Sequence, residues 1–159
     1  PAETMELLND VVVETFPEGK FISIFYTVLY PHDNKVRYCK AAQEPAILVR
    51  KSGEIRELIT KGQVLGLFSE KDFPGLLDFE DGEVELETGD KIFLYTDGII
   101  EAQNKNEDFY GIDRLKELLY EKREMKAQEL IDVVYGDLMD FIEGIPIHDD
   151  LTLLVIEKK

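Results

Sequence analysis

Three observations on the sequence predict an α+β fold. Segments rich in aromatic and β-branched residues follow one another in pairs separated by turn residues, as in β-hairpins. Segments with helical apolar spacing are grouped instead at the start and toward the end of the chain. Of the 159 residues, 44% are hydrophobic and 33% are charged, which is typical of a globular domain. Strands that cluster apart from helices favour α+β over an alternating βαβ arrangement.

Residues 1–16 are predicted to form a helix, because apolar side chains recur there at helical spacing. Pro17 and Gly19 are expected to end that helix. Residues 21–30 are apolar on both faces, which predicts a central strand covered on both sides. Residues 35–42 are expected to pair back onto this strand as a hairpin. The apolar positions of the predicted helix are Met5, Leu8, Val12 and Phe16.

The middle of the chain is expected to add further strands. Residues 46–50 and 54–59 are predicted to form a second hairpin, joined by a Lys-Ser-Gly turn. Residues 62–82 carry several glycines and a proline and are interpreted as an irregular surface flap. Residues 83–87 and 91–96 are predicted to be strands.

Two amphipathic helices are predicted over residues 112–122 and 127–142, each with an apolar face for a sheet and a polar face for water. Gly144 and Pro146 are expected to end the second helix. Residues 151–157 are predicted to form the last strand. Because there is no internal repeat or long linker, residues 1–159 are predicted to form a single domain.

The formal net charge of −16 argues against two classes of partner. An acidic surface repels both a nucleic-acid backbone and anionic lipid, so neither is expected as a partner. No apolar run approaches the roughly 20 residues that span a bilayer, and no signal-peptide pattern opens the chain. The single cysteine, Cys39, allows no internal disulfide, and a cytoplasmic location is therefore expected. The acidic excess can mean solubility alone or carboxylates that hold divalent cations, and composition does not separate the two.

Several familiar catalytic arrangements are absent from the sequence. There is no G-x-S-x-G nucleophile motif and no G-x-x-x-x-G-K-[ST] phosphate loop. Two histidines and one cysteine cannot form a structural zinc site without carboxylates. Cys39 lies in a strand pattern and is interpreted as a structural cysteine. Carboxylate chemistry is what remains.

Three aspartates lie where predicted strands begin or end. Asp97 follows an apolar strand and precedes Gly98, and Asp149 and Asp150 lie just before the last strand. Carboxylates are preferred ligands of Mg²⁺ and Mn²⁺, so Asp97 and Asp149 are expected to share a metal if their strands are neighbours. On spacing alone, the alternatives are an ordinary Asp-Gly turn and an acidic loop.

The sequence segments around these aspartates resemble those of a known family. Residues 94–104 match L-Y-T-D-G-[VIL]-x-E-A-x-N, and residues 148–152 match H-D-D-[IL]-T. Both signatures are similar to those of SpoIIE-like bacterial protein phosphatases, of the metal-dependent type 2C superfamily. Order and spacing agree over nearly the whole chain. Further matches lie at residues 1–9, 21–26, 62–67, 88–90 and 109–111.

The resemblance implies an antiparallel β-sandwich flanked by helices in four αββα layers, with two Mn²⁺ or Mg²⁺ ions. It implies an enzyme in which a water activated by both metals hydrolyses phosphoserine or phosphothreonine. Asp97 and Asp149 would be metal ligands and catalytic residues, supported by Gly98, Asp150 and Thr152. The expected substrate is a phosphorylated regulatory protein in bacterial signalling, resembling an anti-anti-sigma factor.

The sequence departs from the family pattern at two places. Nothing matches the family's D-[VI]-S-G-H-G segment, whose aspartate bridges the metals, so an N-terminally truncated domain is expected. These residues alone are then expected to have weak or no activity, and exposed sheet edges are expected to favour self-association. The family's A-G-H-x-P occurs with Ala42 and Gln43 in place of glycine and histidine. A degenerate, non-catalytic module that binds partners is the alternative hypothesis.

Overall fold

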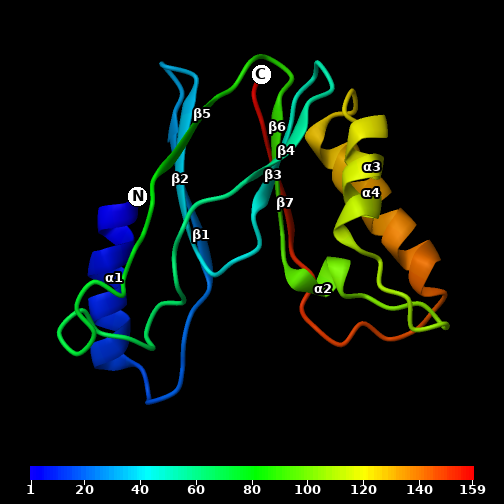
Figure 1. Ribbon diagram of the computed structural model, residues 1–159. Helices are drawn as coiled ribbons and strands as arrows, with labels where there is room; N and C mark the ends of the chain where they lie inside the picture. The colour runs from blue at the N-terminus through cyan, green and yellow to red at the C-terminus, as the bar shows by residue number, and fades with distance from the viewer. The chain divides into compact units, whose positions relative to one another are not determined.

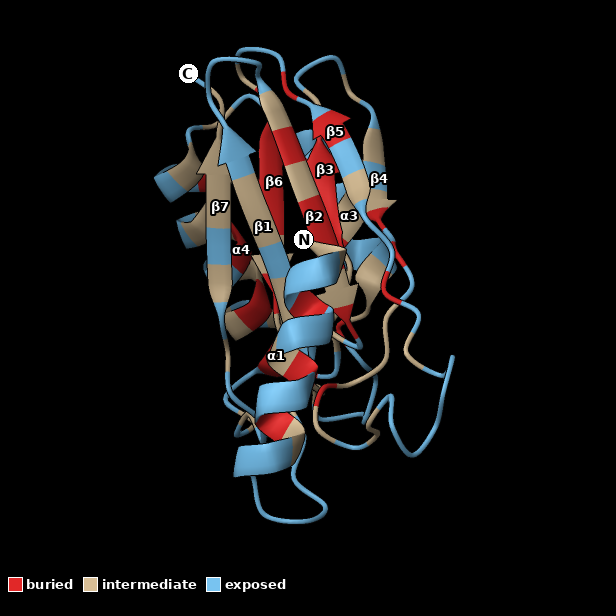
Figure 2. Cartoon of the chain, turned by 90° about the vertical axis from the view of Figure 1, so that its left-hand side faces the viewer, coloured by how far each residue is buried: buried red, intermediate tan, exposed pale blue.

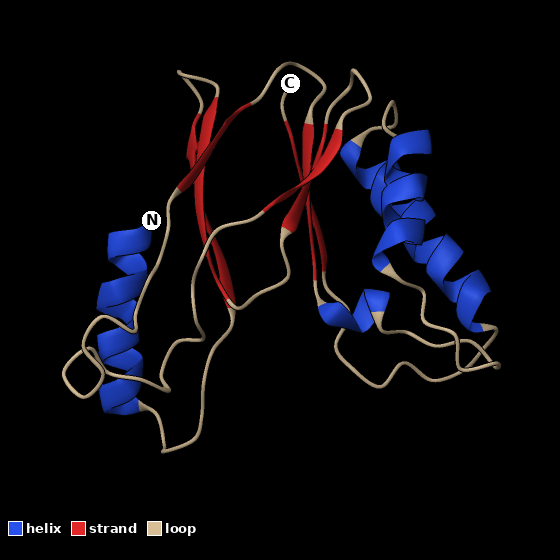
Figure 3. Cartoon of the chain, viewed as in Figure 1, coloured by secondary structure: helices blue, strands red, loops and turns tan.

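The computed structural model describes residues 1–159, which divide into two compact units. The first unit comprises Pro1–Pro45 and Leu58–Leu86, and the second comprises Ala46–Glu57 and Glu87–Lys159. Each unit holds one antiparallel sheet with helical structure packed on it (Figures 1 and 3). The predicted α+β class, with antiparallel sheets and flanking helices, is confirmed.

The first unit consists of helix α1 (Ala2–Thr15) and a three-stranded sheet. Strand β2 (Lys35–Ala41) lies between β1 (Ile24–Tyr30) and β5 (Gly82–Glu85), and both pairings are antiparallel. The hairpin predicted for the first two strands is therefore confirmed. The buried residues of α1 form a stripe along one side of the helix (Figure 2). The buried core of the first unit consists of Met5, Cys39, Ala41, Leu65 and Phe79.

The loop between Leu58 and Gly82 contains no helix or strand, as predicted for the flap. It is anchored to α1 by Asn9, whose side chain is completely buried. The Asn9 amide nitrogen donates to the Phe68 carbonyl (2.9 Å), and the Gly66 amide donates to the Asn9 side-chain oxygen (3.0 Å). A buried asparagine is stable there because both ends of its amide are hydrogen-bonded.

Two predictions for this unit are wrong. Strand β1 is not central, because it pairs with β2 alone, and Leu29 and Tyr30 near its end are 48% and 39% exposed. Aromatic and β-branched residues favour a strand at an edge as well as at a centre, so composition does not distinguish the two. Phe16 does not belong to the helical face: α1 ends at Thr15, and Phe16 has an extended backbone and is exposed.

The second unit contains a four-stranded antiparallel sheet in the order β4-β3-β6-β7. Helices α3 (Ile112–Glu121) and α4 (Ala127–Ile142) lie beside one another on one face of it (Figure 1). Both helices and all four strands were predicted to within two residues at each end. The strands are β3 (Ala46–Val49), β4 (Ile55–Leu58), β6 (Lys91–Tyr95) and β7 (Leu153–Glu157).

The core of the second unit lies between the helices and the sheet. It is formed by alternate residues of the central strands and by the apolar stripes of both helices. The core residues include Ile47, Val49, Phe93, Ile99, Leu115, Leu119, Leu130, Val134 and Leu138.

None of the helices in the chain combines the length and the apolar composition that crossing a bilayer requires.

Two buried charged residues fix the start of β6. Asp90 accepts hydrogen bonds from the Arg50 guanidinium (2.6 Å) and from the Lys51 and Glu87 amides. The Lys91 ammonium donates to the carbonyls of Gly89 (3.0 Å) and Arg123 (2.9 Å). Lys91 thereby joins β6 to the turn between α3 and α4. The strand that leads to Asp97 is held firmly at its other end.

Candidate active site

The two segments predicted to carry the chemistry come together because β6 and β7 are neighbours in the sheet. Their register places Tyr95, the last residue of β6, opposite Leu153, the first residue of β7. Asp97 follows the end of β6, and Asp149 precedes the start of β7. The strands are antiparallel, so both aspartates lie at the same end of the sheet.

A short helix, α2 (Asp97–Ile100), begins where β6 ends. The sequence had suggested only that Asp97 and Gly98 lie at a strand end or in a turn. In the structure, the Asp97 carbonyl accepts a hydrogen bond from the Glu101 amide (2.9 Å), which closes the single helical turn. Asp97 is the first residue of this helix, where a negative charge is favourable.

Hydrogen bonds join the two segments just beyond the ends of the strands. The Thr96 amide donates to the Thr152 carbonyl at 3.3 Å. The Thr96 hydroxyl donates to the Asp150 carbonyl at 2.8 Å and accepts from the Thr152 amide at 3.0 Å. These hydrogen bonds directly join the two segments that carry the family signatures, residues 94–104 and 148–152.

Gly98 allows the backbones of the two segments to approach closely. A side-chain carbon at this buried position would lie 2.7 Å from the Asp150 carbonyl oxygen. That separation is shorter than real contacts of a methyl group allow, so any larger residue would push residues 149 and 150 away.

The two candidate ligands are exposed carboxylates, each with one oxygen bonded to a neighbouring backbone amide. The Gly98 amide donates to Asp97 Oδ1 (3.0 Å), and the Asp150 amide donates to Asp149 Oδ1 (2.7 Å). Asp150 contributes its backbone N–H and carbonyl to the site, through the bonds to Asp149 and Thr96. Thr152 likewise contributes its backbone.

The donor chemistry at this edge fits a hard divalent cation. Mg²⁺ is commonly bound in proteins through one or two carboxylates, with water and substrate phosphates completing an octahedral set. Asp97 and Asp149 can supply those carboxylates. The chain contains no group of three or more histidine, cysteine, aspartate or glutamate side chains placed to hold a metal ion.

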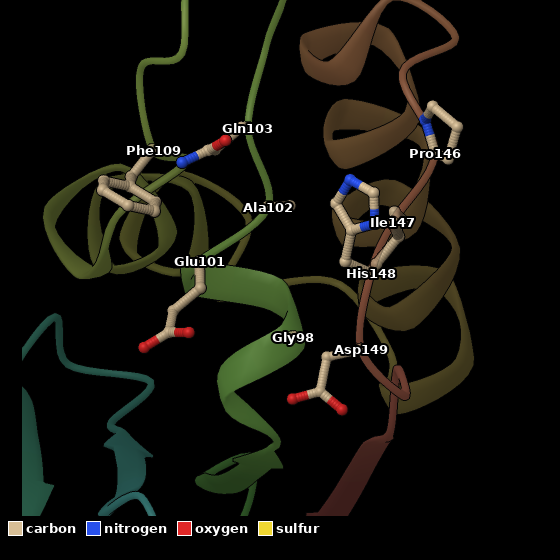
Figure 4. A pocket seen from close by; sticks show the side chains of 9 residues that line it. All are labelled: Gly98, Glu101, Ala102, Gln103, Phe109, Pro146, Ile147, His148 and Asp149. Atoms are coloured by element: carbon tan, nitrogen blue, oxygen red, sulfur yellow. The ribbon is translucent and has the colours of Figure 1, made fainter.

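A pocket of about 220 Å³ adjoins Asp149 (Figure 4). One wall comes from α2 and the segment that follows it, and the other comes from the segment before β7. The Glu101 and Asp149 carboxylates point toward the same end of it, while Gln103 and His148 lie toward the other end (Figure 4). The lining residues are Gly98, Glu101, Ala102, Gln103, Phe109, Pro146, Ile147, His148 and Asp149.

Asn104 shapes the loop that carries Phe109 into this pocket. Its side-chain oxygen accepts hydrogen bonds from the amides of Asn106 (2.8 Å) and Asp108 (3.0 Å). Gln103 and Phe109 then pair as an isolated antiparallel bridge. Asn104 belongs to the matched signature, but the motif alone did not reveal this structural role.

Behind the loop, a polar network ties Tyr110 to both long helices. The Tyr110 hydroxyl donates to Asp137 (2.8 Å), and the Arg114 guanidinium forms two hydrogen bonds with that carboxylate, each 2.9 Å. The bonds from Arg114 hold the pKa of Asp137 below its ordinary value, although burial opposes the shift. Burial and the Asp137 charge raise the pKa of the Tyr110 hydroxyl, so it remains a hydrogen-bond donor.

Similarity to solved structures defines the class of domain. The SiaA-PP2C domain of Pseudomonas aeruginosa matches with a TM-score of 0.84 and 18% identity, over 100% of this chain and 61% of that chain. The Mn-presoaked phosphatase domain of SpoIIE from Bacillus subtilis matches with a TM-score of 0.65 and 14% identity, over 97% of this chain and 73% of that one. The fold is that of a type 2C phosphatase domain.

Sequence comparison identifies the family within that class. The family described as Stage II sporulation protein E (SpoIIE) matches residues 1–159, and the chain belongs to this family. The phosphoserine phosphatase RsbU of Bacillus subtilis (strain 168) is 30% identical over 160 residues, covering 100% of this chain. The chain spans 45% of the length of RsbU. The resemblance stated from the signatures is confirmed.

Proposed function

We propose that the protein is a metal-dependent phosphatase that hydrolyses phosphoserine or phosphothreonine on a regulatory protein. The observation that carries the proposal is the convergence of Asp97 and Asp149 at one end of the β6–β7 pair. Two exposed carboxylates on adjacent strand ends suit an oxyanion substrate only when cations offset their charge. Membership of the SpoIIE family supports the same conclusion.

Asp97 and Asp149 are proposed to hold two Mn²⁺ or Mg²⁺ ions. When bound, such ions acidify a water molecule and neutralise phosphate oxygens during in-line displacement. The position of the two carboxylates relative to each other is maintained by the close approach at Gly98 and by hydrogen bonds of the Asp150 and Thr152 backbones. The chain has neither a serine-nucleophile motif nor an exposed cysteine, in agreement with direct attack by water.

The proposed substrate is a phosphorylated protein of the anti-anti-sigma type. The name of the relative RsbU, a phosphoserine phosphatase, supports phosphoserine as the target. The pocket beside Asp149 is proposed to receive residues that flank the phosphorylated position. Its wall combines apolar surface from Phe109 and Ile147 with the polar groups of Gln103 and His148.

Phosphate release by the full-length protein tests the proposal. We expect release from a serine-phosphorylated regulatory protein in the presence of Mn²⁺, and no release after chelation or from a tyrosine-phosphorylated protein. Binding of the phosphoprotein without turnover would instead support the non-catalytic module. Ala42 and Gln43, where the family pattern has glycine and histidine, are the observation that favours that second possibility.

A further inference from the structure

Thr96 occupies the position between the last residue of β6 and Asp97. Its hydroxyl has two partners in the other segment: the Asp150 carbonyl at 2.8 Å and the Thr152 amide at 3.0 Å. An amide can only donate and a carbonyl can only accept. The hydroxyl hydrogen therefore points at Asp150, and a hydroxyl oxygen lone pair faces Thr152. No side chain without a hydroxyl can satisfy both partners in the same space.

This hydroxyl acts where the regular sheet has ended. The paired register stops at Tyr95 and Leu153, and beyond it the backbone contact is a single bond from Thr96 to Thr152 at 3.3 Å. Residues 149 to 151 have no strand partner there. Apart from the packing of Leu151 against the core, their position beside the end of β6 is set by the Thr96 hydroxyl and by the close approach at Gly98.

Each candidate ligand is next in sequence to a residue that takes part in the hydrogen bond between the Thr96 hydroxyl and the Asp150 carbonyl. Asp97 follows Thr96 directly, and Asp149 precedes Asp150, whose carbonyl receives the hydroxyl hydrogen. The Asp150 amide in turn donates to the Asp149 carboxylate at 2.7 Å. A change at Thr96 would therefore alter the placement of Asp149 relative to Asp97.

We propose that Thr96 is a positioning residue that sets the relative placement of Asp97 and Asp149 for binding of a divalent ion. This inference rests on the proposed function, because it assigns the two carboxylates to the metal. Thr96 is proposed to contact neither the metal nor the substrate. Its effect is transmitted through the backbone of residues 150 and 152.

Two substitutions separate the hydroxyl from the shape of the side chain. Thr96→Val keeps the volume and the branching at Cβ but removes both hydrogen bonds, whereas Thr96→Ser keeps the hydroxyl. Thr60→Val is a matched control, because the buried Thr60 hydroxyl also accepts a backbone amide, that of Lys40 at 3.0 Å. Thr60 belongs to the first unit, whereas both candidate ligands belong to the second.

The readout is Mn²⁺ affinity of the full-length protein, measured by titration calorimetry. We expect Thr96→Val to weaken binding about 10- to 100-fold, as outer-shell substitutions at metal sites do. Thr96→Ser should bind as the wild type does, and Thr60→Val should lose thermal stability without losing affinity. Hydrogen exchange at the Thr152 amide should become faster in Thr96→Val alone.

Distinct results overturn the inference and the proposed function. Wild-type affinity in Thr96→Val, or an equal loss in Thr96→Ser, would overturn the positioning role while leaving the metal site intact. An equal loss of affinity in Thr60→Val would also overturn it, because general destabilisation would then explain the effect. Absence of Mn²⁺ binding by the wild type would contradict the proposed function itself and remove the basis of the inference.

Discussion

Ala42 has a left-handed backbone, with φ of +53°, in a loop whose family pattern places glycine at this position. The conformation is stabilised locally, because the Ala42 amide donates to the Gly62 carbonyl at 3.0 Å. An L-residue in this region is strained by roughly 1–2 kcal/mol, and glycine is not. Alanine at this position is therefore expected to cost stability compared with the glycine of the family pattern.

Replacing Ala42 with glycine is expected to stabilise the protein by about 1 kcal/mol, because relief of the strain exceeds the added flexibility of the unfolded chain. Denaturant unfolding of both proteins measures the change. Ala41→Gly is the matched control: Ala41 is completely buried in a strand, and losing its methyl group should destabilise the protein. A less stable Ala42→Gly protein would show that the alanine is not strained.

Gly98 illustrates the opposite constraint, which is space rather than backbone conformation. Gly98→Ala is expected to destabilise the protein by about 1–3 kcal/mol, because the new methyl group would overlap the Asp150 carbonyl. It should also weaken Mn²⁺ binding by displacing Asp149. Unfolding and metal titration of the same preparation would measure both effects.

The control for this substitution lies in helix α4. Gly136 has open space where a side-chain carbon would lie, so Gly136→Ala should stabilise the protein by about 1 kcal/mol through helix propensity. If both alanine substitutions behaved alike, the close approach at Gly98 would have no energetic significance.

For single residues, the sequence could indicate candidate metal ligands but not how their side chains are held in place. Asp97 and Asp149 lie in recognisable signatures, and they were expected to share a metal if their strands were neighbours. Thr96 carries no sign of its role, because its partners are backbone atoms some 50 residues away in the chain. Backbone partners leave no residue type in the sequence to recognise.

Among the elements, helix α1 is joined to two residues of the flap by hydrogen bonds of the buried Asn9 side chain. Asn9→Ala is expected to destabilise the protein by about 2–3 kcal/mol, because the Gly66 amide and the Phe68 carbonyl would lose their partner in a buried site. Denaturant unfolding would measure the loss. Hydrogen exchange should also become faster at the Gly66 amide.

Asp10→Ala is the control, since Asp10 lies next to Asn9 on α1 but is exposed. Its unfolding free energy should stay within about 0.5 kcal/mol of the wild type. A similarly small change in Asn9→Ala would mean that the flap is held by other contacts.

Element type was largely predictable, whereas element position in a sheet was not. Helices α3 and α4 have strong 3.6-residue periodicity, and their bounds followed from it. Strand β5 joins β2, whereas β6, which follows it in the chain, joins β3. Short strands of similar composition carry no local signal for such partners. Helix α2, with four residues, is too short to show any periodicity.

For the whole molecule, the carboxylates of Asp90 and Asp137 are expected to make the free energy of unfolding decrease at acidic pH. Burial alone would raise the pKa of Asp90, but hydrogen bonds from Arg50, Lys51 and Glu87 lower it overall. Hydrogen bonds from Arg114 lower the pKa of Asp137. A lowered folded-state pKa stabilises the fold above the ordinary aspartate value of about 3.9. That contribution disappears as pH falls through the folded-state pKa.

Comparing the wild type with Asp90→Asn isolates the contribution of Asp90. The variant should be less stable by about 2–4 kcal/mol at pH 7, because Arg50 loses a buried counter-charge. The difference should shrink as the pH falls below about 4. Urea unfolding from pH 7 to pH 3 measures it, and the general repulsion due to the net charge of −16 nearly cancels between the two proteins. A difference independent of pH would contradict the assigned shift.

We propose that Asp97 and Asp149 together bind the metal ions on which the activity of this phosphatase domain depends. This proposal is tested by measuring Mn²⁺-dependent phosphate release from a serine-phosphorylated protein by the full-length protein and its Asp97→Asn and Asp149→Asn variants. Asp140→Asn, a change at an exposed position on α4, serves as the control. We predict a loss of at least about 100-fold in turnover for each site variant and none for the control. Normal turnover by Asp97→Asn or Asp149→Asn would show that the substituted aspartate is not a ligand of a catalytic metal ion.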